Sequence, residues 1–362
     1  LEQLLPLELK EYNIGISAFG RSRDWRRALS MLDMMRITGD NPDLYSFNAA
    51  IAACAKDGQW ECAHALLEEM RSDGVIPDVI TYNSVILACV RARQWVQAVL
   101  VLQDMKARGV KPDIISYNTA ISACVKGMQW DRAKGLLTEM REDGVMPDVI
   151  SYNSAISACA KGGQWESAIE LLVEMRAKGV IPDLISYNAV ISACQKGGQP
   201  ERAQSLLSEM RIVGLIPDVV SYNAAISACV EKGEVDRVRQ LLTEMYEGGI
   251  EADVITYNSA IAACEKDGDW ERAQSLLKEM QTRGVMPDVI SFNTAAQVCK
   301  KGSHWKQALK LLDQMMSIGV TPDVLTFNPT IAACEEGGQK QCVEPLLKLM
   351  QELGVASDSP VQ

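Results

Sequence analysis

A repeat of 35 residues runs through almost the whole chain, and it constrains the fold more than any other feature of the sequence. Glycine stands at every thirty-fifth position from Gly39 to Gly354. Proline keeps the same step at Pro42, Pro77, Pro112, Pro147, Pro182, Pro217, Pro287 and Pro322. A fixed internal period of this size is typical of solenoids, in which each repeat contacts only its neighbours. The 362 residues are therefore expected to form an array of repeats rather than two or three globular domains.

The period divides the chain into ten repeats between two short flanks. Residues 1–8 are the expected N-terminal flank, and residues 359–362 are the expected C-terminal tail. The ten repeats are 9–43, 44–78, 79–113, 114–148, 149–183, 184–218, 219–253, 254–288, 289–323 and 324–358.

The apolar residues of one repeat predict two helices. In the repeat 79–113, the apolar residues from Tyr82 to Cys89 are spaced at i, i+3, i+4 and i+7, as on one face of a helix. Thr81 is a suitable N-cap, so this first helix is expected to begin near it. A second apolar series begins at Trp95 and predicts a second helix that ends before Gly109, because glycine suits the residue after a helix.

The expected helices have about 11 to 13 residues, and isolated helices of that length are only marginally stable. Each pair must therefore bury its apolar faces against neighbouring pairs. The expected fold class is all-α, a right-handed superhelical α-solenoid of stacked helix-turn-helix repeats. Pro200 opens an expected second helix and fits there, because the first turn of a helix tolerates proline. The last repeat is atypical, with Pro345 inside its second helix, as expected at the end of a solenoid.

Nine of the eleven cysteines occupy one position in successive repeats, from Cys54 to Cys334. Equivalent atoms of stacked repeats lie too far apart for a disulfide, which joins Cα atoms within roughly 7 Å. These cysteines are interpreted as small apolar core residues in a reducing compartment. No Cys-x-x-Cys pair occurs, and no metal site or cofactor is expected. No apolar run is long enough to span a membrane, and no targeting peptide is expected in this chain.

A polar stripe runs along the expected first helices. In the repeat 114–148, Asn118, Ser122 and Lys126 follow one another at i, i+4 and i+8 and so project from one side. The fifth residue is Asn in all ten repeats, and the thirteenth is basic in eight. A merely solvated position would vary, and Asn is a poor interior helix residue. We therefore infer that this Asn has a role beyond helix stability.

The final residue of every repeat is Asp, even where Ala252 or Ser357 replaces the preceding proline. Turn formation alone does not explain this constancy. A turn or N-cap role is one interpretation, and a binding role shared with the constant Asn is the other.

The phrases V-[IV]-[ST]-Y-N at the start of a repeat and G-V-x-P-D at its end resemble the signature of the pentatricopeptide repeat family, in the class built only from 35-residue units. The likeness covers nearly the whole chain. It implies single-stranded RNA binding along a concave groove, with one base per repeat read by the fifth and last residues. It also implies that the Asn and Asp combination favours uracil, with cytosine a weaker second choice.

The resemblance assigns three rows of residues to RNA. The base-recognition pairs are Asn13 and Asp43, Asn48 and Asp78, Asn83 and Asp113, Asn118 and Asp148, Asn153 and Asp183, Asn188 and Asp218, Asn223 and Asp253, Asn258 and Asp288, Asn293 and Asp323, and Asn328 and Asp358. The second residue of a repeat is similar to a wedge between bases, in the row Tyr45, Ile80, Ile115, Ile150, Ile185, Val220, Ile255, Ile290 and Leu325, from which Lys10 departs. The thirteenth residue is similar to one that meets phosphate, in the row Arg21, Lys56, Arg91, Lys126, Lys161, Lys196, Lys266 and Lys301.

The chemistry of the Asn side chain is consistent with uracil. An amide both donates and accepts, so it can pair with N3–H and O4 of uracil, and a flipped amide could serve cytosine. A neighbouring carboxylate, which only accepts, would restrain that flip. The predicted target is therefore a tract of about eight to ten uracils, whose 5′ end the resemblance places near the N-terminal repeat.

A net charge of −11 is unusual for a protein that binds nucleic acid. Acidic residues such as Asp131 and Glu139 gather on the expected second helices, which are expected to form a convex layer away from RNA. Glu231 and Glu336 interrupt the basic row.

Seven tryptophans, from Trp25 to Trp305, begin expected second helices. Stacking on bases is one interpretation, and packing between helices is the favoured one because they belong to the apolar series. The methionine series from Met35 to Met350 is likewise interpreted as core.

Three classes of function remain open from the sequence. The leading hypothesis is a non-catalytic protein that binds a U-rich segment of an organellar transcript and affects its stability, processing or translation. The resemblance places the chloroplast ahead of the mitochondrion. A protein-binding scaffold would need varied anchors in place of one uniform pair. An enzyme is not expected, because family members that edit or cut RNA carry further domains. Catalysis would need a segment outside this chain or an RNA-processing protein partner.

Overall fold

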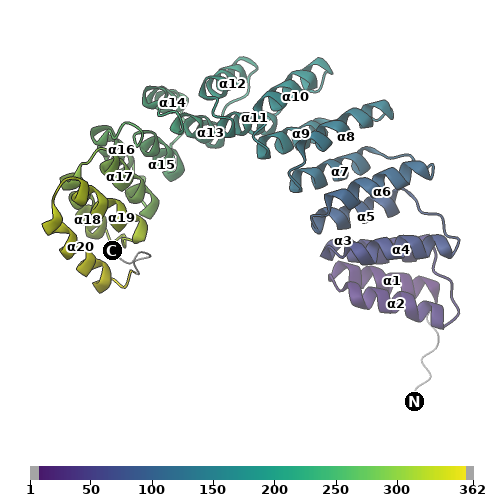
Figure 1. The fold of residues 1–362 in the computed structure, drawn as a ribbon. Helices are drawn as coiled ribbons and strands as arrows, with labels where there is room; N and C mark the ends of the chain where they lie inside the picture. The colour runs from purple at the N-terminus through teal and green to yellow at the C-terminus, as the bar shows by residue number, and fades with distance from the viewer. Residues whose placement is uncertain (1–7, 356–362) are drawn as a thin grey trace. The chain divides into compact units, whose positions relative to one another are not determined.

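The computed structural model describes residues 8–355, which form twenty α-helices and no β-strand. The chain divides into two compact units, residues 1–189 and 190–362, and each is described by itself. In Figure 1 each repeat contributes one helix pair, with an odd-numbered first helix and an even-numbered second helix.

The N-terminal unit contains α1 (Leu9–Arg21), α2 (Trp25–Ile37), α3 (Leu44–Asp57), α4 (Trp60–Ser72), α5 (Val79–Arg91), α6 (Trp95–Ala107), α7 (Ile114–Lys126), α8 (Trp130–Glu142), α9 (Val149–Lys161) and α10 (Trp165–Ala177). The boundary between the units falls within α11 (Leu184–Lys196). The C-terminal unit contains α12 (Pro200–Ile212), α13 (Val219–Val230), α14 (Val235–Glu247), α15 (Val254–Ala263), α16 (Trp270–Thr282), α17 (Val289–Lys301), α18 (Trp305–Ser317), α19 (Val324–Glu336) and α20 (Lys340–Glu352).

Within each unit the helices form two layers. In the N-terminal unit the first helices pack on one another in order, α1 on α3, α3 on α5, α5 on α7 and α7 on α9. The second helices α2, α4, α6 and α8 each pack on the first helix of their own repeat and on that of the next. The C-terminal unit repeats this plan, with α13, α15, α17 and α19 in one layer. The expected all-α solenoid of stacked helix pairs is confirmed within both units.

The first helices begin three residues earlier than the apolar spacing suggests. The N-cap of α5 is Asp78, and the prediction that Thr81 caps this helix was wrong. The Oδ1 of Asp78 accepts from the backbone N–H of Thr81 at 2.8 Å, and the hydroxyl of Thr81 accepts from the backbone N–H of Asp78 at 3.2 Å. This reciprocal capping box satisfies two backbone donors at the helix start. The same box opens α3, α7, α9, α13, α15, α17 and α19.

The second helices end as expected. Gly109 follows α6 with a φ of 78°, a left-handed conformation that glycine adopts without steric cost. The N–H of Val110 then reaches back to the carbonyl of Met105 at 3.1 Å, which closes the helix end.

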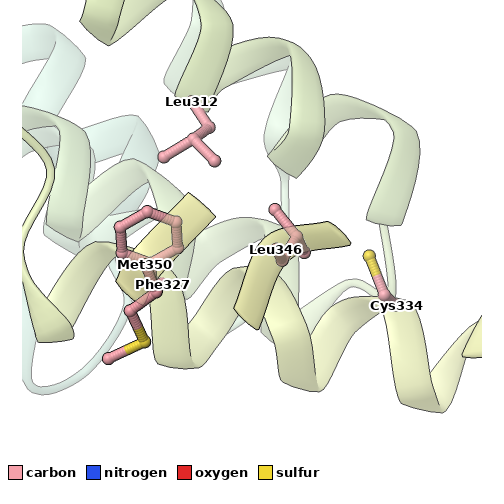
Figure 2. Packing of buried hydrophobic residues seen from close by; sticks show 5 residues of the cluster. All are labelled: Leu312, Phe327, Cys334, Leu346 and Met350. Atoms are coloured by element: carbon pink, nitrogen blue, oxygen red, sulfur yellow. The ribbon is translucent and has the colours of Figure 1, made fainter. Parts of the chain in front are cut away.

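The core lies between the two layers, and Figure 2 shows its last section. Leu312 of α18, Phe327 and Cys334 of α19, and Leu346 and Met350 of α20 pack together, each with at most 5% of its surface exposed. Full burial of a large apolar side chain is worth about 1.5–3 kcal/mol, so neighbouring repeats depend on each other for their stability.

The repeated cysteines lie within this core, and the tryptophans lie at its edge, where all but the buried Trp270 are partly exposed. A Cβ added to Gly127 would lie 2.4 Å from Cδ1 of Trp95, so this indole fills the space beside the next repeat. Packing between helices is thus the interpretation that the structure supports for the tryptophans. Cys89 is fully buried, and burial raises the pKa of its thiol to about 12.

Candidate nucleic-acid interface

The constant Asn and the constant Asp of a repeat meet by hydrogen bonding, although thirty residues separate them. Asn118 stands on the second turn of α7, and Asp148 is the N-cap of α9, which packs beside α7. The Asn Nδ2 donates to the Asp Oδ1 in Asn13–Asp43 (3.5 Å), Asn48–Asp78 (3.3 Å), Asn83–Asp113 (3.2 Å), Asn118–Asp148 (3.3 Å), Asn153–Asp183 (3.0 Å), Asn223–Asp253 (3.1 Å), Asn258–Asp288 (3.2 Å) and Asn293–Asp323 (3.0 Å).

The two remaining expected pairs are those of Asn188 with Asp218 and of Asn328 with Asp358. Asn188 stands on α11 and Asp218 is the N-cap of α13, so they fall in different compact units. Asn328 is exposed on α19, whereas its expected partner Asp358 lies outside the described residues.

A buried hydroxyl, which was not predicted as part of the site, completes each of these contacts. The hydroxyl of Ser151 lies 2.6 Å from Oδ1 of Asn118 and 2.8 Å from Oδ1 of Asp148. The equivalent hydroxyl contacts Asn in Asn13–Ser46, Asn48–Thr81, Asn83–Ser116, Asn153–Ser186, Asn223–Thr256, Asn258–Ser291 and Asn293–Thr326, at 2.5 to 2.6 Å. All these Ser and Thr residues have no exposed surface. The signal was in the sequence, because the third residue is Ser or Thr in every repeat after the first.

The hydrogen bonds also lower the pKa of the Asp side chain and so favour its ionised form. Partial burial acts to raise the pKa of Asp148, but the backbone N–H and hydroxyl of Ser151 and the amide of Asn118 outweigh it, so the pKa lies below its ordinary value. The pKa is lowered for the same reasons at Asp43, Asp78, Asp113, Asp183, Asp253 and Asp288. These carboxylates are ionised at neutral pH and can only accept hydrogen bonds.

The expected wedge residues form an exposed apolar row on the first helices. Their exposed fractions are 59% for Tyr45, 64% for Ile80, 57% for Ile115, 63% for Ile150, 62% for Ile185, 60% for Val220, 62% for Ile255, 60% for Ile290 and 61% for Leu325. Ile115 and Asn118 are three residues apart on α7 and therefore lie on one face of it. A regular row of exposed large apolar residues indicates a binding surface.

The expected phosphate-binding row lies at the C-terminal ends of the first helices, except that Lys266 follows the end of α15 by three residues. Lys56 is half-buried, whereas Arg21, Arg91, Lys126, Lys161, Lys196, Lys266 and Lys301 are exposed. The Nζ of Lys126 donates to the carbonyl of Val90 at 3.3 Å, and that of Lys56 donates to the carbonyl of Gly20 at 3.1 Å. These carbonyls belong to the last turn of the preceding first helix, where a cation is favoured. The row therefore also supports the stacking of repeats.

Many acidic residues lie on the second helices, where basic side chains of the preceding second helix pair with them. Glu139 of α8 contacts Lys106 of α6 at 2.8 Å, and Glu174 of α10 contacts Arg141 of α8 at 2.5 Å. Much of the negative charge therefore lies in the layer of second helices, whereas the Asn residues of the Asn and Asp pairs lie on the first helices.

A cavity of about 560 Å³ lies between α14 and α16, also in the layer of second helices. Val238, Tyr246 and Arg283 line it, and the guanidinium of Arg283 stands 3.6 Å from the centre of the Tyr246 ring. The Asn and Asp pairs do not line this cavity. Within residues 8–355, no helix is long and apolar enough to cross a bilayer, and no group of three His, Cys, Asp or Glu residues is placed to hold a metal ion.

Protein-family models match most of the chain. Residues 12–132 and 44–212 match the pentacotripeptide-repeat region of PRORP. Residues 217–266 and 252–301 match the PPR repeat family, and residues 290–320 match the PPR repeat. Comparison with curated proteins gives no match.

Two solved structures illustrate the likeness. The crystal structure of the pentatricopeptide repeat protein PPR10 from maize has 24% sequence identity and a TM-score of 0.62, over 98% of this chain and 60% of that one. PPR10 in complex with an 18-nt psaJ RNA element has 26% identity and a TM-score of 0.54, over 97% of this chain and 54% of that one. The chain therefore spans less than two thirds of the length of these PPR10 structures.

Proposed function

The chain belongs to the pentatricopeptide repeat family, and on that premise we propose that it binds single-stranded RNA along the face of its first helices, one base per repeat. The observation that carries the proposal is the recurring contact between an Asn amide and an ionised Asp, seen for example at 3.3 Å in Asn118 and Asp148. A stack of equivalent repeats that each read one base is a known architecture for RNA recognition.

The two flanking rows fit the same ligand. The exposed apolar row from Tyr45 to Leu325 offers one apolar contact per repeat to the faces of neighbouring bases. The basic row from Arg21 to Lys301 lies two turns beyond the Asn residues, where it would meet the phosphates of a strand that follows the stack. Uniform polar pairs suit a repetitive polymer, because each repeat then meets the same chemical group.

We propose uracil as the preferred base and cytosine as the second choice. An ionised Asp can only accept, so it orients the Asn nitrogen as a donor, and uracil carries the acceptor O4 where cytosine carries a donating amino group. Discrimination at one position is expected to be on the order of 1–3 kcal/mol. The proposed target is a U-rich tract of about eight to ten nucleotides in an organellar transcript, with any processing enzyme supplied by a partner protein.

The test is a titration of the protein against fluorescent U10, C10, A10 and G10 RNA at two salt concentrations. Tight binding of U10, weaker binding of C10 and still weaker binding of the purine tracts is the expected result. Equal and strongly salt-dependent binding of all four would contradict base recognition, and binding of none would contradict the proposal as a whole.

Two matched variants locate the site. Replacement of Asn83, Asn118 and Asn153 by Ala should abolish much of the preference for U10. Replacement of Gln103, Thr138 and Ser208, which are exposed on second helices, by Ala should leave the preference unchanged.

A further inference from the structure

We infer that the buried hydroxyl of the third residue in each following repeat is a positioning group for base recognition, which holds the preceding Asn amide with a single N–H turned to the base. The inference rests on the proposed function and concerns a residue outside the Asn and Asp pair. For the repeat 114–148, this hydroxyl belongs to Ser151.

Three distances define the arrangement at this repeat. Ser151 Oγ lies 2.6 Å from Oδ1 of Asn118, and Oδ1 of Asp148 lies 3.3 Å from Nδ2 of the same Asn. Ser151 Oγ and Asp148 Oδ1 are themselves only 2.8 Å apart. The two partners therefore stand side by side in front of one amide group.

These distances show which edge of the amide is occupied. The oxygen and nitrogen of an amide are about 2.2 Å apart, given standard bond lengths. Partners 2.8 Å apart that reach both atoms must lie on the shared edge, which points away from Cβ. If both partners lay on the outer sides of the amide, next to Cβ, they would be more than about 5 Å apart at normal hydrogen-bond lengths. The same holds if one partner lay on an outer side and the other on the shared edge. The shared edge of Asn118 is thus filled by Asp148 and Ser151.

One N–H and one oxygen lone pair of Asn118 remain, and they point to opposite outer sides of the amide, about 120° apart. One base cannot pair with both. The paired contact to N3–H and O4 of uracil, expected from the sequence, therefore does not fit an amide held in this way. A base meets either the donor or the acceptor of Asn118.

The charges of the partners decide how the amide is turned. With Nδ2 toward the ionised Asp148, the outer N–H is the free donor. A flip would bring the oxygen of Asn118 against the carboxylate, where two acceptors face each other. The hydroxyl of Ser151 has one proton, which it shares between the amide oxygen at 2.6 Å and Oδ1 of Asp148 at 2.8 Å. It so holds the second end of the amide, while it accepts from the backbone N–H of Asp148 at 3.2 Å.

Removal of the hydroxyl leaves the amide held at one end only. The terminal torsion of Asn is broad, so the group can then turn within the site. An amino group of cytosine, which donates, could then recruit the freed oxygen. The hydroxyl is therefore expected to support uracil over cytosine at the base that faces its Asn, without touching that base.

The test is a scan with U10 RNAs that each carry one cytosine at a different position. For the wild type, each inner cytosine should weaken binding about 5- to 150-fold, which corresponds to 1–3 kcal/mol. Ser151→Ala should reduce this penalty at least about threefold at one position only, the one that faces the repeat 114–148. Ser151→Thr should restore the penalty, because Thr81, Thr256 and Thr326 make the same contact to Asn.

A second variant guards against a purely structural effect. Ser151 also closes the capping box of α9, so its loss could weaken binding of every RNA equally. Thr81→Val keeps the buried volume but also breaks the capping box of α5, so the position of the effect is what discriminates. It should reduce the cytosine penalty only at the position that faces the repeat 44–78. Thermal unfolding of both variants measures any loss of stability.

Failure of the positioning role can be distinguished from failure of the proposed RNA recognition. A wild-type preference for uracil with a penalty that Ser151→Ala and Thr81→Val leave unchanged, or lower equally at every position, would overturn the inference alone. A wild type that binds U10 and C10 equally would overturn the proposed function and the inference with it.

Discussion

Asp183 Oδ1 accepts a hydrogen bond from Nδ2 of Asn153 at 3.0 Å and another from the backbone N–H of Ser186 at 2.8 Å. One carboxylate oxygen thus contacts the candidate site of one repeat and caps the first helix of the next. The N-cap interpretation of the constant Asp is therefore confirmed, whereas a binding role shared with Asn stays a prediction.

Substitution of Asp148 can separate these two roles. Asn is as good an N-cap as Asp, so Asp148→Asn should change the free energy of unfolding little, whereas Asp148→Ala should cost about 1 kcal/mol. Both variants remove the charge that opposes a flip of Asn118. Both should therefore lower the penalty for cytosine at the facing base, as measured with the single-cytosine RNAs. Full retention of the penalty in Asp148→Asn would show that the carboxylate does not orient the amide.

A substitution of Asn itself should change which base is preferred. Asn153→Thr with Asp183 retained should shift one position of the target toward guanine, as family usage implies. The measurement is binding of U10 RNAs that carry one guanine at each position in turn. Improved binding of a single RNA, in which guanine faces the repeat 149–183, is expected. Improvement at no position, or at all of them, would contradict one-base-per-repeat readout.

The period and the two helices of each repeat could be predicted because both depend on local patterns. Apolar spacing defines each helix, and the glycine and proline positions define the turns. The N-cap was misplaced from Asp78 to Thr81 because the spacing begins only at Tyr82, whereas the capping box depends on the two polar residues before it. The apolar periodicity gives no information about these reciprocal hydrogen bonds.

The site could be predicted only in part, because it forms between repeats. The constancy of Asn118 and Asp148 was visible in the sequence, but their contact requires α7 and α9 to pack side by side. The hydroxyl of Ser151 belongs to the following repeat, so counting positions within one repeat could not join it to Asn118. Only Thr81 was interpreted as a helix cap, and a contact from the third residue to the preceding Asn was not predicted.

The second helices carry contacts that stabilise the stack without facing the site. The guanidinium of Arg71 donates to the hydroxyl of Tyr82 at 2.7 Å and also bonds Asp104, so it joins α4 to the next repeat. Arg71→Ala should lower the free energy of unfolding by about 1–3 kcal/mol, and Tyr82→Phe by about 0.5–1.5 kcal/mol. Because the two groups are in contact, the double variant should lose less than the sum.

Chemical denaturation of the four proteins measures this coupling. RNA selectivity serves as the control. The side chain of Asn83 bonds Asp113 and Ser116 rather than Arg71 or the Tyr82 hydroxyl, so the cytosine penalties should stay as in the wild type. Additive losses of stability would show that the bond between Arg71 and Tyr82 does not join the repeats.

The basic row predicts how binding depends on salt. For a single strand, each neutralised phosphate contributes about 0.7 to the slope of log K against log salt, so eight contacts give a slope of about −5 to −6. Lys126→Ala should make the slope shallower by about 0.7 for U10 and C10 alike, because phosphate carries no base identity. Glu231→Lys should make it steeper by a similar amount. Lys134→Ala, on the second helix α8, should have no effect, and an equal effect there would contradict the assigned row.

Acid should act on the stack through the capping carboxylates. The pKa is lowered in the folded protein at Asp148 and at the six other capping Asp residues named with it above. These groups add stability above their unfolded pKa, near 3.8, and that stability is lost as the pH falls through the folded value. The midpoint of thermal unfolding should thus change little through these groups between pH 8 and pH 5 and fall below about pH 4. Asp148→Asn removes one such group and should show a smaller fall than the wild type. Asp131→Asn, at an exposed position of α8, is the matched control, and an equally reduced fall in that variant would show that the capping carboxylates are not the source.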